Sequence, residues 1–375
     1  MAGIYLHIPF CRHKCLYCDF YSVASLGQKD LMVAALCSEL DQRKDYLAGM
    51  VIDTIYFGGG TPSVLTAGDV GQILDRIKCY FSINDNVEVT LEANPEDLSA
   101  TFLQELYLVG VNRLSIGIQS FCDDHLRYFG RHHSAAQAFE SFHAARNAGF
   151  NNISIDLIYG FPGLATEQWD RNVEMAIELS AEHISAYQLM VEPGSLFFKR
   201  QQQGNFVPAN DEESIRHYQQ LTARLGSVGY EHYELSNFCK PGYESRHNSS
   251  YWYGAHYLGL GPAAHSYNSE SRQWNAAYNK RYLDGISSGR LAFEIEYLSE
   301  EEKYNELLLT RLRTSRGLLR TELDGLSIQT RKFFENQVRK MLNVGLVEER
   351  ATGWIIPEQK WFISDGIIAD MMMNR

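Results

Sequence analysis

Residues 3–18 read GIYLHIPFCRHKCLYC, a short β-type run followed at once by three closely spaced cysteines. The run GIYLHI (3–8) is the first of six such stretches, and the others are TIYFG (54–58), EVTLEA (88–93), RLSIGI (113–118), ISIDLI (153–158) and ISAYQLM (184–190). Amphipathic helical patterns such as LMVAALCSELDQRKDYL and DVGQILDRIKCYF separate them. This alternation predicts parallel strands joined by right-handed crossovers. Six units are two short of a closed eight-stranded barrel, so we predict an α/β fold built as an open, partial (β/α)6 TIM barrel.

The composition is that of an ordinary soluble globular protein, with 375 residues, 45% hydrophobic and 21% charged. Lys and Arg number 34 against 46 Asp and Glu, a formal charge of −12, which argues against a broad nucleic-acid surface. No apolar run approaches the roughly 20 residues that span a bilayer, and MAGIYLHIPFC does not resemble a signal peptide. We therefore expect a cytoplasmic protein without a nucleic-acid partner, whose contact with a membrane is at most peripheral.

Three regions follow from the pattern along the chain. Residues 1–205 hold the predicted barrel. Residues 206–295 contain a helical pattern at 211–228 and then a stretch rich in Tyr, Asn, Gly and His, which we interpret as an α/β region that completes the barrel. Residues 296–375 carry helical patterns (EEEKYNELLLTRL, IQTRKFFENQVRKML) before LVEERATGWIIP, which resembles a β-hairpin. The last region is predicted to be a small, mainly helical, winged-helix-like domain.

The cysteine loop has the pattern C-x3-C-x2-C. Its members are Cys11, Cys15 and Cys18, and the next cysteines along the chain are Cys37 and Cys79. Thiolates ligate iron–sulfur clusters, and three ligands without a fourth nearby leave one iron of a cubane open to an exchangeable ligand. A zinc site completed by His7 or His13, or three unrelated thiols, are the alternatives. Cys122 and Cys239 have no ligand spacing.

Polar groups recur at the predicted carboxyl ends of the strands. The cysteine loop follows the first strand, GGGTP (58–62) ends the second, and Glu92, Gln119 and Asp156 fall at the third, fourth and fifth. These ends share one rim of a barrel. Glycines there permit close backbone approach to a ligand, and a carboxylate can accept ribose hydroxyls. Each side chain alone is typical of a surface or cap, but together they favour a nucleoside site.

The loop, with Tyr17 before its last cysteine, resembles that of the radical-SAM superfamily. Longer stretches resemble the oxygen-independent coproporphyrinogen oxidase-like group across the chain: YLHIPFC (5–11), CDF (18–20), GGGTPS (58–63), EANPE (92–96), GIQSF (117–121), FGRHH (129–133) and DLIYGFPG (156–163). The resemblance implies a 4Fe–4S cluster on the three cysteines, whose open iron is chelated by S-adenosylmethionine (SAM). An electron supplied by a reductant then cleaves SAM to methionine and a 5′-deoxyadenosyl radical. The implied SAM contacts are Tyr5, Gly59, Gly60, Thr61, Glu92, Gln119, Arg131 and Asp156.

Two functions occur within this group. The oxidase carries a further cysteine where this chain has Phe20, and an extension ahead of its cluster, whereas Cys11 here is preceded by ten residues. The chain is more similar to HemW-type haem chaperones, which keep Phe at this position, bind haem and pass it to haemoproteins. Dimerisation through the cluster is compatible with this resemblance. Oxidative decarboxylation of coproporphyrinogen III is the alternative function.

HemW-type chaperones share a motif, H-N-x-x-Y-W, found here as HNSSYW at residues 247–252. His and Tyr ligate haem iron in other proteins, and Trp can stack on a macrocycle. His247, Tyr251 and Trp252 are therefore candidate haem contacts, with His256 and His265 as competing ligands. The alternative is a structural loop in which His247 satisfies neighbouring polar groups and Trp252 packs in the core.

Overall fold

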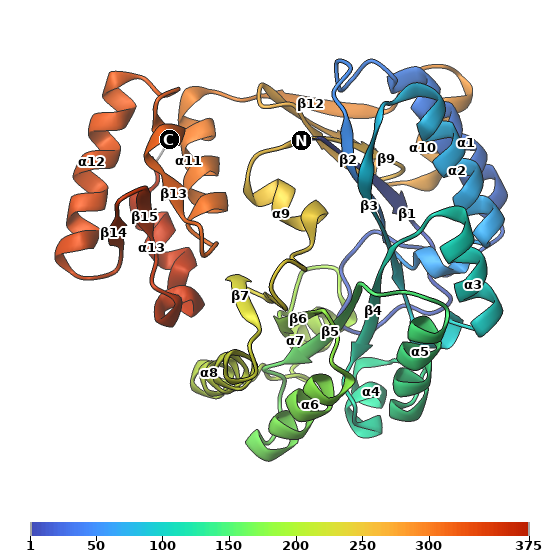
Figure 1. The fold of residues 1–375 in the computed structure, drawn as a ribbon, viewed down its shortest axis with the longest axis horizontal. Coiled ribbons are helices and arrows are strands. Elements are labelled where there is room, and N and C mark those ends of the chain that lie inside the picture. The colour runs from blue at the N-terminus through green and yellow to red at the C-terminus, as the bar shows by residue number, and fades with distance from the viewer. Residues whose placement is uncertain (1, 374–375) are drawn as a thin grey trace.

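The computed structural model describes residues 2–373 and confirms the open barrel of six βα units. Its parallel strands lie side by side in chain order: β1 (Ala2–Ile8), β2 (Ile52–Gly59), β3 (Ile83–Ala93), β4 (Arg113–Gln119), β5 (Ile153–Tyr159) and β6 (His183–Gln188). The helices between them are α1 (Lys29–Arg43), α2 (Ala67–Tyr80), α3 (Ala100–Val109), α4 (Asp123–Phe129), α5 (Ala135–Asn147) and α6 (Thr166–Leu179), and they line the outer side of the sheet (Figure 1).

The six strands form because both of their faces are covered. Every residue of β4 is buried, and only the central residue of β1 and of β5 is partly exposed. Such near-continuous apolar runs are typical of parallel strands packed between helices and a barrel interior. The helix starts are equally local: Thr66 caps α2 in a reciprocal capping box with Asp69. The pairing of β1 with β2 in parallel register brings the cysteine loop beside the glycine-rich end of β2.

The sheet continues beyond the six predicted strands on both sides and has twelve strands within residues 2–373. At one edge β9 (His256–Leu260) pairs in parallel with β1, followed by β10 (His265–Tyr267), β11 (Ser271–Asn275) and β12 (Phe293–Tyr297). At the other edge, β8 (Asn237–Cys239) and β7 (Glu231–Glu234) follow β6. The predicted boundary between residues 295 and 296 falls inside β12, so the sheet extends two residues past it.

The remaining helices complete the barrel region and the C-terminal region. α8 (Asp211–Ser227) confirms the helix predicted at 211–228, and α7 (Leu196–Gln202), α9 (Arg246–Trp252) and α10 (Asn279–Ser287) lie around it in the chain. The C-terminal region holds α11 (Glu300–Arg311), α12 (Ile328–Asn343), α13 (Ser364–Met371) and a small sheet of β13 (Leu318–Leu319), β15 (Gly353–Ile355) and β14 (Glu348–Arg350). β14 and β15 form the predicted hairpin. Figure 1 shows this region on the side of the molecule where α9 and β7 lie.

No helix within residues 2–373 combines the length and the apolar character needed to cross a membrane.

Candidate functional site

A cavity of about 400 Å³ lies at the carboxyl ends of the barrel strands. It brings together ten of the residues that the sequence singled out: Cys11, Cys15, Cys18, Gly59, Gly60, Thr61, Glu92, Gln119, Arg131 and Asp156. The cavity is also lined by His13 and Phe20, which the sequence singled out for other reasons, and by residues that it did not single out, namely Lys14, Asn94, Ser115, Gly117, Tyr187 and Met190. The rim predicted from the order of strands and motifs is therefore one continuous site.

The cysteine loop is tied to the barrel on both sides. The Cys11 amide donates to the Val23 carbonyl (3.1 Å) and the Leu16 amide to the Phe129 carbonyl (3.0 Å). Two of the thiols accept hydrogen bonds from side chains of the barrel. The Thr61 hydroxyl donates to Cys11 Sγ, and Arg131 Nη1 donates to Cys15 Sγ, each at 3.4 Å. These hydrogen bonds hold two of the three thiols at the cavity.

The three thiols fit a cluster better than a single zinc ion. Within residues 2–373, the one group of three metal-ligating side chains whose donor atoms all lie within 4.8 Å of one another does not include the loop cysteines. At least two of the three loop thiols are therefore more than 4.8 Å apart. Ligands of one tetrahedral zinc at about 2.3 Å would lie closer together. His7 does not complete a zinc site, because its Nε2 contacts the Tyr21 carbonyl (2.8 Å) and its Nδ1 the Tyr5 hydroxyl (3.2 Å). The donor set and spread suit a cubane.

The end of β2 has no room for side chains. A Cβ on Gly60 would lie 2.6 Å from the Phe10 carbonyl oxygen and 2.8 Å from that of Ile8. Gly59 has φ +107°, and a Cβ there would lie 2.6 Å from the His7 ring. The backbone itself bonds to the loop, since the Gly60 amide donates to Ile8 (2.9 Å). The glycines therefore expose backbone groups to the cavity while holding the start of the cysteine loop.

Arg131 is the cation that joins the loop to the barrel. Its Nη2 donates to Asn94 Oδ1 and to the Gly117 carbonyl, each at 2.7 Å, while Nη1 reaches Cys15. Its Nε is buried and has no hydrogen-bond partner. An unpaired buried donor costs free energy, which an acceptor oxygen on a bound ligand would recover. The position suits recognition of an anionic ligand group.

Two carboxylates face the cavity, Glu92 from β3 and Asp156 from β5, with β4 between these strands. Burial raises the pKa of Glu92 to about 7, against a hydrogen bond from the Tyr56 hydroxyl (2.7 Å) that lowers it. Burial likewise raises the pKa of Asp156 to about 6, against a hydrogen bond from Ser115 (3.3 Å). The buried Arg113 lowers the pKa of both carboxyl groups. This pair of acceptors on one wall suits the two hydroxyls of a ribose.

Removal of the Glu92 charge is expected to stabilise the metal-free protein at alkaline pH. The folded protein keeps a proton on Glu92 up to about pH 7, whereas the unfolded chain loses it near 4.5, so stability falls as pH rises between these values. Glu92→Gln should therefore raise the free energy of unfolding by on the order of 2 kcal/mol at pH 8 and by little at pH 5. Urea unfolding at the two pH values measures this, and an equal gain at both would contradict it.

Comparisons with known proteins place the chain in a family. The model of the radical SAM superfamily matches residues 5–176. Proteins called heme chaperone HemW are similar along most of their length: that of Mycobacterium tuberculosis is 36% identical over 84% of this chain and 82% of its own, and that of Escherichia coli 32% identical over 95% and 94%. The chain belongs to the HemW family of radical SAM proteins. Membership implies a 4Fe–4S cluster and SAM.

The HemW family shares its fold with an enzyme. The coproporphyrinogen III oxidase HemN from Escherichia coli superposes with a TM-score of 0.85 and covers 99% of this chain and 90% of its own, at 21% identity. At that identity the likeness concerns the fold alone. It confirms the radical-SAM type of barrel and extends over the C-terminal region as well.

Tyr5 is not among the residues that line the cavity, and the SAM contact expected of it stays a prediction. Its ring stacks on Tyr56 and on His247, with ring centroids 6.1 and 6.3 Å away, and its hydroxyl contacts His7. Tyr5 is the central residue of β1 and the one residue of this strand that is partly exposed.

The HNSSYW segment places His247 inside the barrel, where this residue is 1% exposed. Its Nδ1 contacts the Thr54 hydroxyl (2.8 Å) and its Nε2 the Tyr251 hydroxyl (2.7 Å), so neither ring nitrogen nor the Tyr251 oxygen faces outward as an iron ligand. Burial lowers the pKa of His247 to about 3, so the ring is neutral. These contacts agree with the structural alternative for the motif, in which His247 satisfies neighbouring polar groups, and haem contacts of His247 and Tyr251 stay a prediction. Trp252 is partly exposed and stays a prediction.

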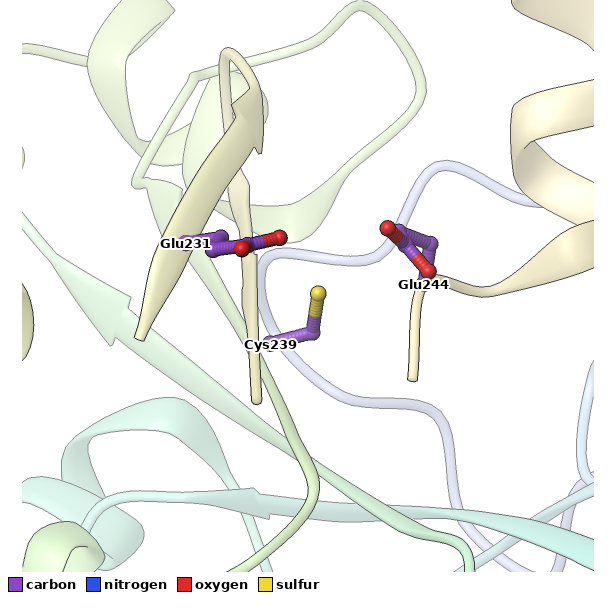
Figure 2. Close-up of side chains that lie close together, drawn as sticks. All are labelled: Glu231, Cys239 and Glu244. Carbon is purple, nitrogen blue, oxygen red and sulfur yellow. The ribbon is translucent and has the colours of Figure 1, made fainter. Parts of the chain in front are cut away.

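The closely spaced trio mentioned above consists of Glu231, Cys239 and Glu244. Figure 2 shows the Cys239 thiol lying between the two carboxylates. Glu231 and Cys239 are partners across β7 and β8, and Glu244 lies in the loop before α9. Burial raises the pKa of the Cys239 thiol to about 12, and the amide of Tyr243 donates to it. A protonated, hydrogen-bonded thiol is a poor ligand, so this trio adds nothing to the site.

Proposed function

We propose that this protein is a haem chaperone: it binds a 4Fe–4S cluster, SAM and haem, and passes haem to acceptor haemoproteins. The observation that carries the proposal is an exposed apolar rim beside the cysteine loop. Phe20 and Met190 are each 64% exposed, and both line the mouth of the cavity. Similarity to proteins that bear the name heme chaperone supports it.

The three cysteines of the loop, Cys11, Cys15 and Cys18, hold the cluster in this proposal. Backbone groups of Gly59 and Gly60 and the Thr61 hydroxyl receive the amino acid part of SAM, and Arg131 pairs with its carboxylate. Gln119 lies beside this group on the same wall. Glu92 and Asp156 accept the ribose hydroxyls. A bound cluster would supply the electron for reductive cleavage of SAM. An external reductant must then return an electron to the cluster.

In this proposal haem binds to the apolar rim and not to the HNSSYW motif. Tyr187, 43% exposed, completes the rim with Phe20 and Met190. Large apolar side chains that stay exposed around a cavity are typical of a surface that a ligand covers. Aromatic rings also stack favourably on a flat macrocycle. The rim therefore gives haem a face next to the cluster.

Coproporphyrinogen oxidation is the second candidate, and the fold shared with HemN is its main support. Phe20 stands where the oxidase pattern has a cysteine, and its ring is exposed at the mouth of the cavity. An apolar ring at this position can contact a bound macrocycle, but it cannot perform the chemistry of a cysteine thiol. Binding and release of haem is the function that this geometry favours.

Phe20→Glu is expected to weaken haem binding about tenfold, because it removes an apolar contact and adds a charge beside the macrocycle. The measurement is a titration followed at the Soret band of the cluster-loaded protein under anaerobic conditions. Leu108→Glu is the matched control, since Leu108 is 83% exposed on α3, away from the cavity. Equal haem affinity of Phe20→Glu and wild type would contradict the placement of haem on the rim.

Transfer is tested separately. Haem-loaded protein is mixed with an apo-haemoprotein whose haem-bound spectrum differs from that of the donor. Movement of the Soret band to that of the acceptor, at a rate above that of free haem, supports the chaperone. Haem that stays on the protein, or that transfers no faster than free haem, argues against it.

A further inference from the structure

The HNSSYW segment lies against the inner side of the barrel, where α9 contacts β1 and β2. Its His247 ring stacks on Tyr56, with ring centroids 4.9 Å apart and planes 25° from parallel. The Tyr5 ring lies parallel to both within the same group. His247 thus forms one face of the packing around Tyr56.

His247 is held in a single orientation from three sides. Its ring nitrogens contact the hydroxyls of Thr54 and Tyr251, and its backbone amide donates to Glu88 Oε1 (3.0 Å). A buried ring with both nitrogens paired cannot rotate without losing a hydrogen bond, and such a loss is unfavourable. The ring therefore presents a fixed flat surface to Tyr56.

Tyr56 connects the fixed ring of His247 with the cavity. Its ring is buried on β2 and its hydroxyl donates to Glu92 Oε1 at 2.7 Å. Glu92 lines the cavity at the end of β3. The other groups that act on Glu92 are the buried Arg113 on the neighbouring strand β4, Asp156 on β5, and the Gly59 amide, which donates to it. Tyr56 is thus the side-chain donor that fixes one carboxylate oxygen.

We propose that the HNSSYW segment positions the SAM site, with His247 orienting Tyr56 and Tyr56 orienting Glu92 toward the ribose of SAM. This inference rests on the SAM site proposed above. Both residues are positioning residues, since neither lines the cavity. It assigns the histidine of the motif to SAM affinity instead of haem ligation.

The segment is also tied to the C-terminal region. Arg311 of α11 donates to the Trp252 carbonyl at the end of α9, and pairs with Glu322 at 2.7 Å. A buried cation that joins two regions through a carbonyl fixes the end of the helix. The C-terminal region therefore fixes the end of α9, and with it the HNSSYW segment, against the barrel.

The test compares SAM affinity of the cluster-loaded protein with that of Tyr56→Phe, by anaerobic calorimetric titration. Loss of the hydroxyl removes a hydrogen bond to a charged group, so SAM should bind about tenfold more weakly. Because that bond lowers the pKa of Glu92, the pH at which affinity falls off on acidification should move upward by about one unit. The ring remains, so the stack and the fold are retained.

Tyr282→Phe is the matched control. Tyr282 is also buried and donates to a buried carboxylate, Glu39, at the same 2.7 Å, but between α10 and α1 and outside the cavity. Its SAM affinity and pH profile should equal those of wild type. His247→Gln, which keeps hydrogen-bonding groups and loses the flat ring, should weaken SAM binding while haem uptake at the Soret band stays unchanged.

The outcomes separate this inference from the proposed function. Wild-type protein that fails to bind SAM overturns the SAM site itself. Wild-type protein that binds SAM, with Tyr56→Phe equal to it in affinity and pH profile, overturns the positioning role and leaves the SAM site standing. Loss of haem uptake in His247→Gln with SAM affinity retained also overturns it. An equal loss in Tyr282→Phe shows a general effect of losing a buried hydroxyl, and contradicts the inference.

Discussion

Replacement of any one of Cys11, Cys15 or Cys18 by alanine is expected to abolish retention of the iron–sulfur cluster. These cysteines line one cavity, and two of the thiols already accept hydrogen bonds from the barrel. A cubane held by three protein ligands is labile when one is removed, because two irons then lack protein ligands. Iron and acid-labile sulfide, measured after anaerobic reconstitution and desalting, should fall from about four per chain to below one.

Cys79→Ala is the matched control for this experiment. Cys79 is exposed on α2 and does not line the cavity, so its removal should leave iron and sulfide content unchanged. Full cluster content in any of the three loop variants would contradict the assignment of that cysteine as a ligand. Equal loss in the Cys79 variant would show that cluster content follows the total number of thiols.

Gly60→Ala is expected to lower the stability of the metal-free protein by about 1–3 kcal/mol and to abolish SAM binding. The added Cβ would lie 2.6 Å from the Phe10 carbonyl and 2.8 Å from the Ile8 carbonyl, and both are backbone atoms that cannot rotate away. The end of β1 must shift, and the cysteine loop begins one residue after Phe10. Urea unfolding measures the first effect and calorimetric titration of cluster-loaded protein the second.

Gly68→Ala provides the comparison for Gly60→Ala. A Cβ on Gly68 would come no closer than 3.7 Å to a flexible threonine side chain, and this residue lies in the first turn of α2. Alanine is the better helix former, so this variant should equal or exceed wild type in stability. Wild-type stability and SAM affinity in Gly60→Ala would show that the loop tolerates the shift, and would contradict the close packing of β2 against it.

The sequence was sufficient for the six barrel strands because each is a long apolar run bounded by a helical pattern. Strand β1 is seven residues long and buried along nearly its whole length, which a single sequence reveals directly. The strands at the sheet edges were missed because they are three to five residues long and rich in Tyr, His and Asn. β9, for example, is identified as a strand by its parallel pairing with β1. Such pairing joins segments far apart in the chain and leaves no local pattern.

The difference between local patterns and contacts distant in the chain also explains which site residues the sequence could place and which it could not. Cys11, Glu92 and Asp156 were predicted because each lies in, or shortly after, a strand of its own, and the barrel brings these strands together around one cavity. The sequence left two alternatives open for His247 because its partner Thr54 is 193 residues away, and its burial depends on α9 folding into the barrel. A histidine in a motif carries no local sign of whether it faces a ligand or a hydroxyl.

The measurement that tests the account most directly is an anaerobic assay of cluster-reconstituted protein with SAM and reductant, in which coproporphyrinogen III and haem are offered in separate reactions. The account predicts stoichiometric haem binding and no conversion of coproporphyrinogen III. Conversion to protoporphyrinogen with release of 5′-deoxyadenosine would contradict the chaperone function, and would show that Phe20 at the mouth of the cavity is compatible with decarboxylation.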